Sequence, residues 1–184
     1  MKNSRITRRD AIKTTAAVTA GIVSNPRFAF AGGQRATMRV GVIGCGGRGT
    51  GAAVNCVESS EGVEIVSMGD LFADHLASSR QQLAEQLGAA FKVTNDTAFT
   101  GYDAFENVLA TDIDMVILAT PPAFRPQHLR AAIDAGKNIF TEKPIAVDPM
   151  GVSLVIEASE IAKEKSLAIV SGTQRRHQAP YLEA

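Results

Sequence analysis

A glycine-rich hexapeptide constrains this chain more than any other feature. The segment Gly44–Gly49 (GCGGRG) fits the spacing G-x-G-x-x-G and directly follows an apolar run, Val40–Ile43, that predicts a strand. In that setting Gly44 allows a tight turn, Gly46 lets the backbone approach a pyrophosphate, and Gly49 allows a helix to pack closely on the strand. Such loops also occur in turns and phosphate sites of other kinds, so the surrounding sequence has to decide.

The sequence after the hexapeptide supports a dinucleotide site. A helix-compatible run follows at residues 50–57, and a second apolar run, Val63–Met68, leads to Asp70 about 20 residues past the motif. A carboxylate there would accept hydrogen bonds from ribose hydroxyls; a helix cap or a solvent-facing turn acid is the alternative. Because Asp70 would repel a 2′-phosphate, NAD is expected rather than NADP. In the hexapeptide, Gly47 belongs to the predicted phosphate loop, whereas Arg48 could reach a phosphate or point into solvent.

The chain beyond residue 36 alternates short apolar runs with longer helical patterns. This alternation predicts an α/β fold over residues 36–184, a Rossmann doubly wound parallel sheet of about six strands with helices on both faces. The expected strands are Val40–Ile43, Val63–Met68, Phe91–Val93, Met115–Ala119, Ile139–Thr141 and Leu167–Val170.

Three further helices are expected, over about residues 74–87, from Pro126 to Gly136, and from the N-cap Asp148 onward. Their expected buried positions are Leu76, Leu83 and Leu87 in the first, Leu129, Ala132 and Ile133 in the second, and Val152, Val155, Ile156 and Ser159 in the third.

Two short loops follow the fourth and fifth expected strands, Ala119–Pro122 (ATPP) and Thr141–Pro144 (TEKP). Ligands of open parallel sheets bind at the carboxyl ends of the strands. Lys143 is therefore aimed at the cofactor edge, where a lysine can donate hydrogen bonds to a substrate hydroxyl and help to move its proton. The alternative is a surface lysine paired with Glu142.

These motifs together resemble the Gfo/Idh/MocA family of NAD(P)-dependent oxidoreductases, most of which act on sugars, polyols and their derivatives. The resemblance rests on GVIGCGGRG, Asp70, ATPP, HLRAAIDAGKNIFTEKPIAVD and GTQRRH, and it covers nearly all of the chain from Met38 onward. It implies that Lys143 belongs to the catalytic group. It also places beside the cofactor Thr120, Pro121, Glu142, Lys143 itself, Gln174 and Arg175.

The resemblance further implies a larger C-terminal α/β domain, which holds the substrate pocket and completes the catalytic set. The chain stops just past its sixth expected strand, so we expect it to be the N-terminal half of a longer protein, a homo-oligomer at full length. No motif makes His177 the family's catalytic histidine. His128 is expected to pack or cap, and no role is expected for His75 on the solvent side of its helix.

Three functions fit the sequence. The first is hydride transfer between a sugar- or polyol-like alcohol and the nicotinamide cofactor. The second is an NAD-dependent glycosidase of the same family, a branch in which the lysine of EKP tends to be missing, so that Lys143 favours the first. The third is a non-catalytic nucleotide-binding fragment.

The first 31 residues predict an export signal. Arg8 and Arg9 precede a weakly apolar run, Thr14–Val23, which is too short to span a bilayer, and Ala29-Phe30-Ala31 supplies a small-x-small cleavage site. The twin arginine resembles the signal of the Tat route, so the Tat machinery is an expected partner and the periplasm the expected location. An ordinary basic N-terminal helix or tail is the alternative.

Charge and cysteine content bear on three further possibilities: a nucleic-acid partner, a disulfide and a metal site. The first 31 residues hold six basic side chains and one acid, which leaves 13 basic and 18 acidic groups in the remainder. No basic stripe with interleaved aromatic residues is present, so nucleic acid is not an expected partner. Cys45 and Cys56 lie too far apart along the predicted turn and helix to form a disulfide, and no metal-ligand spacing occurs.

Overall fold

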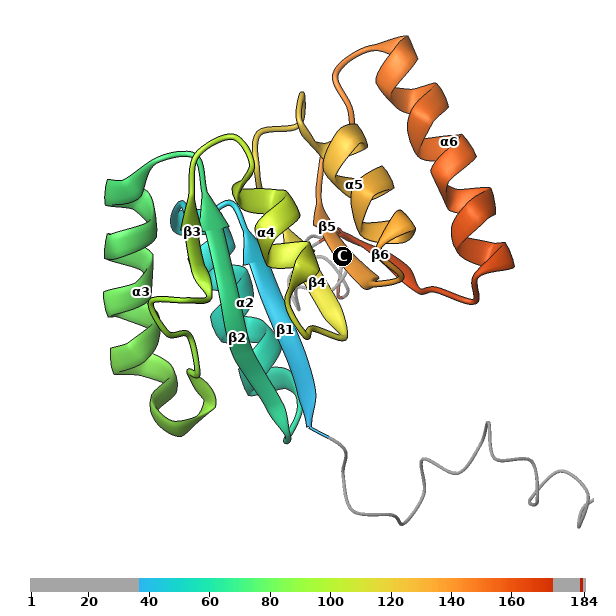
Figure 1. The fold of residues 1–184 in the computed structure, drawn as a ribbon. Helices are drawn as coiled ribbons and strands as arrows, with labels where there is room; N and C mark the ends of the chain where they lie inside the picture. Colours follow the sequence, from blue (N-terminus) through green and yellow to red (C-terminus); the bar gives the residue numbers. More distant parts are fainter. Residues whose placement is uncertain (1–36, 174–182, 184) are drawn as a thin grey trace, which may run out of the picture. The chain divides into compact units, whose positions relative to one another are not determined.

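The computed structural model describes residues 37–173 and residue 183. The segment 37–173 forms a six-stranded parallel sheet with helices on both faces (Figure 1). The strand order is β3-β2-β1-β4-β5-β6, with every neighbouring pair parallel. The expected Rossmann fold is therefore confirmed. The strands are β1 (Met38–Ile43), β2 (Val63–Asp70), β3 (Ala98–Thr100), β4 (Met115–Leu118), β5 (Asn138–Glu142) and β6 (Ile169–Gly172).

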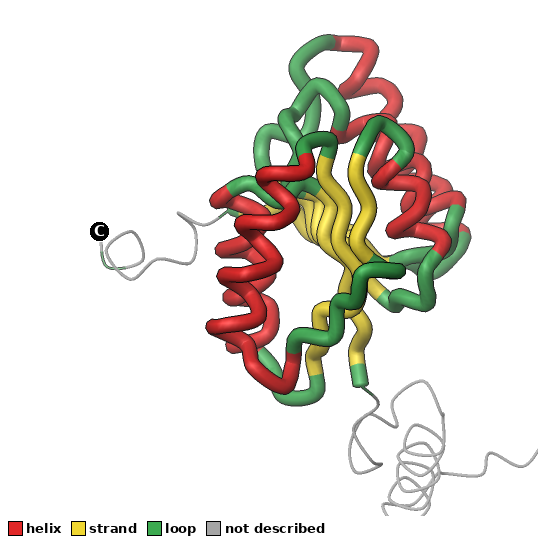
Figure 2. Tube along the Cα trace, turned by 60° about the vertical axis from the view of Figure 1, so that its left-hand side comes forward, coloured by secondary structure: helices red, strands yellow, loops and turns green. Residues whose placement is uncertain are grey.

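The helices are distributed over the two faces of the sheet, as Figure 2 shows with the strands running between them. The helices α2 and α3 share one apolar cluster with the sheet, and α4, α5 and α6 share the other. Their bounds are α2 (Gly47–Ser59), α3 (Ala73–Leu87), the 3₁₀ turn η2 (Gly88–Ala90), α4 (Ala104–Ala110), α5 (Arg125–Asp134) and α6 (Pro149–Glu164).

The central strand β4 shows why the sheet needs both layers. Its sequence MVIL is continuously apolar. Ile117 packs in the α2–α3 cluster, whereas Val116 and Leu118 pack in the cluster on the other face. Side chains alternate between the two faces of a strand. When both faces are covered, every side chain of the strand is buried, and apolar residues are favoured at all positions.

The expected positions of the third strand were wrong. Phe91 makes only one isolated bridge, to Ile65, and the strand itself lies at Ala98–Thr100, where it pairs with the carboxyl end of β2. The apolar run around Phe91 fills the core beside α3 instead of extending the ladder. The short helix α4 that follows, which the sequence reading did not identify, buries Phe105, Val108 and Leu109.

The expected buried face of α6 was also wrong in part. Val155 is buried, but Val152 and Ile156 are 46% and 61% exposed. The face that packs against the rest of the domain carries mostly small residues, which let the helices approach closely. The buried residues of α6 are Gly151, Val155, Ala158 and Ala162.

The turn between β1 and α2 depends on close backbone packing. Gly44 has φ +94°, a conformation that side chains rarely adopt, and α2 begins already at Gly47, inside the glycine motif. A Cβ on Gly49 would lie 1.8 Å from the carbonyl oxygen of Gly44, whereas a Cβ on Gly47 would meet nothing within 4 Å. The first turn of α2 therefore rests directly on the end of β1.

This geometry predicts opposite results for two matched substitutions in the absence of ligand. Gly49→Ala should lower the free energy of unfolding by about 1–3 kcal/mol or more, because the backbone must shift to admit the methyl group. Gly47→Ala should leave that free energy unchanged or raise it by up to about 1 kcal/mol, because alanine favours the helix. Urea unfolding followed by circular dichroism measures both; equal effects of the two substitutions would contradict the packing described for α2.

Candidate functional site

The candidate site lies at the carboxyl ends of the strands, around the point where the strand order reverses. The strands β2 and β4 both flank β1, so the loops after β1, β2 and β4 converge at one edge of the sheet. In doubly wound sheets the crevice at this edge is where ligands bind. The loop after β5, which carries Lys143, lies at the same edge because β5 pairs in parallel with β4.

Asp70 is the last residue of β2, and it is buried. Its Oδ2 accepts a hydrogen bond from the backbone N–H of Cys45 at 2.5 Å, and its Oδ1 accepts one from the N–H of Phe72 at 2.9 Å. The carboxylate thus joins the glycine-rich turn to the end of β2. A carboxylate has about four acceptor positions, so Asp70 keeps capacity for further donors.

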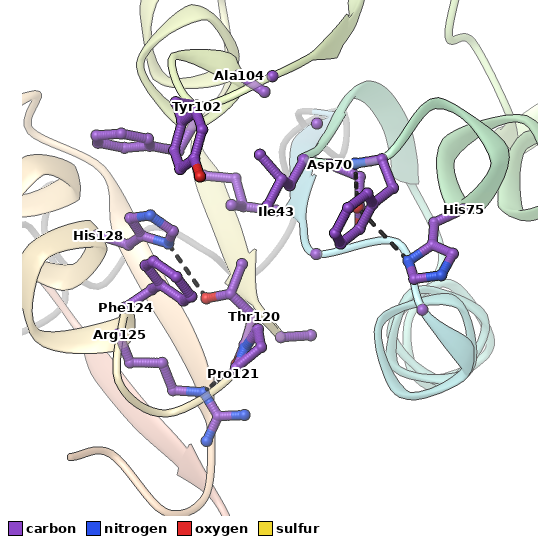
Figure 3. Close-up of a pocket in the computed structure, with 18 residues that line it drawn as sticks. Ile43, Asp70, His75, Tyr102, Ala104, Thr120, Pro121, Phe124, Arg125 and His128 are labelled. Atoms are coloured by element: carbon purple, nitrogen blue, oxygen red, sulfur yellow. Dashed lines mark hydrogen bonds and ion pairs between the residues drawn. The ribbon is translucent and has the colours of Figure 1, made fainter. Parts of the chain in front are cut away.

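His75 is exposed on α3, as expected, and it also lies beside Asp70. Its Nδ1 lies 3.7 Å from Oδ1 of Asp70, and its ring meets that of Phe72 edge-on at a centroid distance of 5.3 Å. The ring is half exposed, but it lines the same pocket as Asp70 instead of pointing only into solvent (Figure 3). His75 lies in the first turn of α3, which follows closely on the end of β2, and the helical pattern of α3 alone could not reveal this neighbour.

A pocket of about 540 Å³ opens between these loops. Its walls come from the glycine-rich turn and from the loops after β2, β3 and β4, and they are mainly apolar and aromatic, with Asp70 as the acid (Figure 3). The lining side chains include Ile43, Asp70, Phe72, His75, Tyr102, Phe105, Thr120, Pro121, Phe124, Arg125 and His128.

The N-terminus of α2 is open toward ligands. Gly46 is the N-cap, no side chain caps the helix, and no acid stands in its first turn. The first N–H groups of a helix have no partner within it, and they favour anions. An added Cβ on Gly46 or Gly47 would meet no protein atom within 4 Å, so the backbone there presents an unobstructed surface. These features fit a pyrophosphate beside an aromatic pocket.

His128 links the loop after β4 to α5. Its Nδ1 lies 3.1 Å from Oγ1 of Thr120, and its ring stacks on Phe105 at a centroid distance of 4.4 Å. Burial lowers the pKa of His128 to about 4, so the ring is neutral near pH 7. These contacts agree with the packing role expected for His128 and orient the Thr120 hydroxyl at the pocket.

Arg48 is paired within the protein. Its Nη2 donates to Oε1 of Glu142 at 2.6 Å, and the Glu142 side chain is 2% exposed. From the sequence, Arg48 was predicted either to contact a phosphate or to point into solvent. An ion pair between Glu142 and Lys143 was the alternative to a role for Lys143 at the cofactor edge. In the structure Glu142 takes Arg48 instead, and the exposed Lys143 has no hydrogen-bond or ion-pair partner within residues 37–173.

Sequence reasoning missed Arg125, the first residue of α5. It is 6% exposed, and its guanidinium donates to the carbonyl oxygens of Thr120, Glu142 and Pro144. The only signal was its position directly before Pro126 and next to ATPP. A charged residue at a helix start is usually solvated, so that signal is weak.

The remaining expectations concern the two C-terminal site residues, the cysteines, metal binding and membrane spans. Gln174 and Arg175 lie outside the described residues. Cys45 and Cys56 are free thiols; burial raises the pKa of Cys45 to about 12, which keeps it protonated. Over residues 37–173 no cluster of metal-binding side chains occurs, and no helix combines the length and apolarity needed to cross a membrane.

Comparison with known proteins agrees with this geometry. Residues 38–173 match the family model GFO_IDH_MocA, described as an oxidoreductase family with an NAD-binding Rossmann fold. The chain is 35% identical to inositol 2-dehydrogenase 3 of Saccharopolyspora erythraea over 147 residues, 80% of this chain and 39% of that protein. It is 34% identical to a glycosyl hydrolase family 109 protein of Solibacter usitatus over 113 residues, 60% of this chain and 25% of that protein.

A solved structure shares the fold. It is scyllo-inositol dehydrogenase from Lactobacillus casei with bound NAD(H) and scyllo-inositol, which matches with a TM-score of 0.62 at 23% identity, over 80% of this chain and 39% of that one. The chain thus spans about two fifths of the length of the inositol dehydrogenases it matches. With its sheet order, its glycine-rich turn and a family match that covers all six strands, the chain belongs to the Gfo/Idh/MocA oxidoreductase family and contains that family's NAD-binding Rossmann domain.

Proposed function

We propose that this chain is the nucleotide-binding part of an NAD-dependent dehydrogenase that acts on a hydroxyl group of a polyol or a related sugar. The observation that carries the proposal is the convergence of Asp70, the open N-terminus of α2 and the Lys143 loop on one edge of the sheet. The inositol dehydrogenases among its relatives support the polyol class.

The residues of the site fit NAD in a defined order. The N–H groups at the start of α2, around Gly46 and Gly47, would bind the pyrophosphate. Asp70 would accept hydrogen bonds from the adenosine ribose, and the aromatic pocket beside it has walls suited to the adenine ring. Thr120, Pro121 and Glu142 would lie toward the nicotinamide end, as the family resemblance implies. Gln174 and Arg175 remain part of this proposal through the resemblance alone.

Lys143 would act on the substrate and not on the cofactor phosphates. When bound, NAD supplies the hydride acceptor. The Lys143 ammonium is exposed at the edge of the sheet and makes no bond within residues 37–173, so it is available to a substrate hydroxyl. There it would orient the hydroxyl and take part in removing its proton. Arg48 would hold Glu142 in place, because a buried carboxylate requires a cationic partner.

A second candidate is a glycosidase that uses NAD without net reduction. The glycosyl hydrolase family 109 relative supports it at an identity close to that of the inositol dehydrogenase. The two functions differ in products: a dehydrogenase accumulates NADH with each turnover, whereas this glycosidase would release sugar with no net change in NADH. Incubation with polyols and with aryl glycosides therefore separates them.

Export by the Tat route is also proposed, on the basis of Arg8 and Arg9, the apolar run after them, and the Ala-x-Ala site. A Rossmann protein outside the cytoplasm needs a supply of dinucleotide. A route that carries folded proteins would allow NAD to be bound before export, and the cofactor would then have to be regenerated in place.

The Asp70 assignment predicts a change in cofactor preference. Asp70→Ala should weaken NAD binding by about 10–100-fold, since a hydrogen bond to a charged group contributes about 1.5–3 kcal/mol, and should weaken NADP binding less. Asp74→Ala, which removes a nearby exposed acid, is the control. Calorimetric titration with both cofactors decides: equal losses for NAD and NADP would mean that Asp70 acts only by holding the turn at Cys45.

The Lys143 assignment predicts a loss of turnover without a matching loss of cofactor affinity. In the full-length protein Lys143→Ala should lower kcat on its best polyol by about 10²–10⁴-fold, the usual contribution of a positioned acid–base group. The dissociation constant of NAD should change less than about threefold. Lys163→Ala, an exposed lysine on α6, is the control. NADH absorbance over a panel of inositols, sugars and polyols measures turnover; full activity of the Lys143 variant would remove it from the proton path.

The export proposal predicts that changing Arg8 and Arg9 together to lysine keeps the protein in the cytoplasm. The folded domain should be unaffected, because these residues precede residue 37. Fractionation of cells followed by immunodetection measures the outcome, with the unchanged chain as control. Normal periplasmic accumulation of the double variant would rule out the Tat route.

A further inference from the structure

We propose that Arg125 is a positioning residue that fixes the backbone on both sides of Lys143 and joins it to the loop carrying Thr120. The part of this inference that concerns catalysis rests on the proposed function of Lys143. The clamp itself rests on contacts within the domain.

The contacts of Arg125 bracket Lys143 in the chain. Nη1 of Arg125 donates to the carbonyl oxygen of Glu142 at 2.8 Å and to that of Pro144, the residues immediately before and after Lys143. Nε donates to the carbonyl oxygen of Thr120 at 2.8 Å, a contact drawn in Figure 3. One buried side chain thus holds the loop after β4 and the loop after β5 at a fixed separation.

These loops need such a link because the sheet no longer holds them. Between β4 and β5 the last pair is Leu118 with Thr141. The strand β5 continues one residue further against β6, where Glu142 pairs with Gly172, so the ladders end before Thr120 and Lys143. The Glu142 carbonyl lies in the buried part of this edge, and a buried carbonyl needs a donor, which Arg125 supplies. The Lys143 side chain has no partner within residues 37–173, so its position is set by its backbone and not by contacts of its amine.

An arginine suits this position better than a lysine. The guanidinium is planar and carries five N–H donors in a rigid fork, so it can serve carbonyls of two loops at once, whereas a lysine amine is one point on a flexible stem. Burial lowers the pKa of Arg125, and the nearby Glu142 carboxylate opposes that shift. Glu142 therefore stabilises the buried cation while its own backbone carbonyl receives one of the bonds.

The variants for the test are made in the full-length protein. Arg125→Met keeps much of the volume and removes every donor, and Arg125→Lys keeps the charge without the fork. Arg130→Met, on the same helix, removes a partly exposed arginine that pairs with Asp134 and Glu157 at the surface, and serves as the matched control.

The first measurement is hydrogen exchange of backbone amides by mass spectrometry, which needs no substrate. In Arg125→Met, exchange should rise at least about tenfold in residues 120–124 and 143–147 and stay unchanged in residues 38–59, with a smaller rise in Arg125→Lys. Arg130→Met should change neither loop. Unchanged exchange in the two loops, or an equal rise throughout the domain, would overturn the clamp.

The second measurement compares the effect of each variant on kcat with its effect on the NAD dissociation constant. If Arg125 positions Lys143, Arg125→Met should lower kcat by about tenfold or more, since small displacements of reacting groups are costly. The NAD dissociation constant should change less than about threefold, and Arg125→Lys should restore part of kcat. A loss of NAD affinity as large as the loss of kcat would overturn the positioning role. If the unchanged protein oxidises no polyol while the exchange result is as expected, the proposed function fails and the clamp stands.

Discussion

The contact between the ends of β1 and β2 is the constraint on which the rest of the site depends. Asp70, at the end of β2, accepts the N–H of Cys45 in the turn after β1, and the first turn of α2 rests on the carbonyl of Gly44. These two contacts determine where α2 begins and therefore where its unpaired N–H groups point. The carboxylate that we propose to bind the ribose also holds the glycine-rich turn, so a substitution at Asp70 would change cofactor choice and local structure together.

A second constraint connects the two faces of the sheet. Glu142 is buried at the end of β5, and its carboxylate pairs with Arg48 from α2 on one face. Its charge also stabilises Arg125, which comes from α5 on the other face. A buried carboxylate without a cation would be strongly unfavourable, so helices in opposite layers are tied to one residue next to Lys143. The edge of the sheet that carries the candidate site is thereby held from both faces.

Much of the fold could be predicted because its signals are local. The continuous apolar run of β4, the glycine ends of α3 and α5, and the Asp148 N-cap, whose side chain accepts the N–H of Gly151, all act over a few residues. The errors occur where distant packing decides. Phe91 stands in an apolar run typical of a strand, but it packs beside α3. In α6 the interface is formed mostly by small residues, and several of the larger apolar side chains of that helix lie outside it.

The same division holds for the candidate site. The residues 44–49, Asp70 and the two loops that follow β4 and β5 could be placed together from the sequence, because parallel strands bring their carboxyl ends to one edge. The hydrogen-bond and ion-pair partners within the site could not be predicted in this way. Arg48 and Glu142 are far apart in the chain, so their pairing has no local signal. Arg125 donates to backbone carbonyls, and because every residue has a carbonyl, the residue types do not reveal which ones accept these bonds.

The sequence by itself determined that this chain forms a Rossmann domain with a dinucleotide turn, since spacing of glycines and apolar runs is enough to specify strand, turn and helix. Only the tertiary structure decided which charges pair, that His75 lines the pocket, and that Arg125 holds the Lys143 loop. The physical reason is that secondary structure follows from neighbours in the chain, whereas burial and ion pairing depend on which distant segments share the same low-dielectric space.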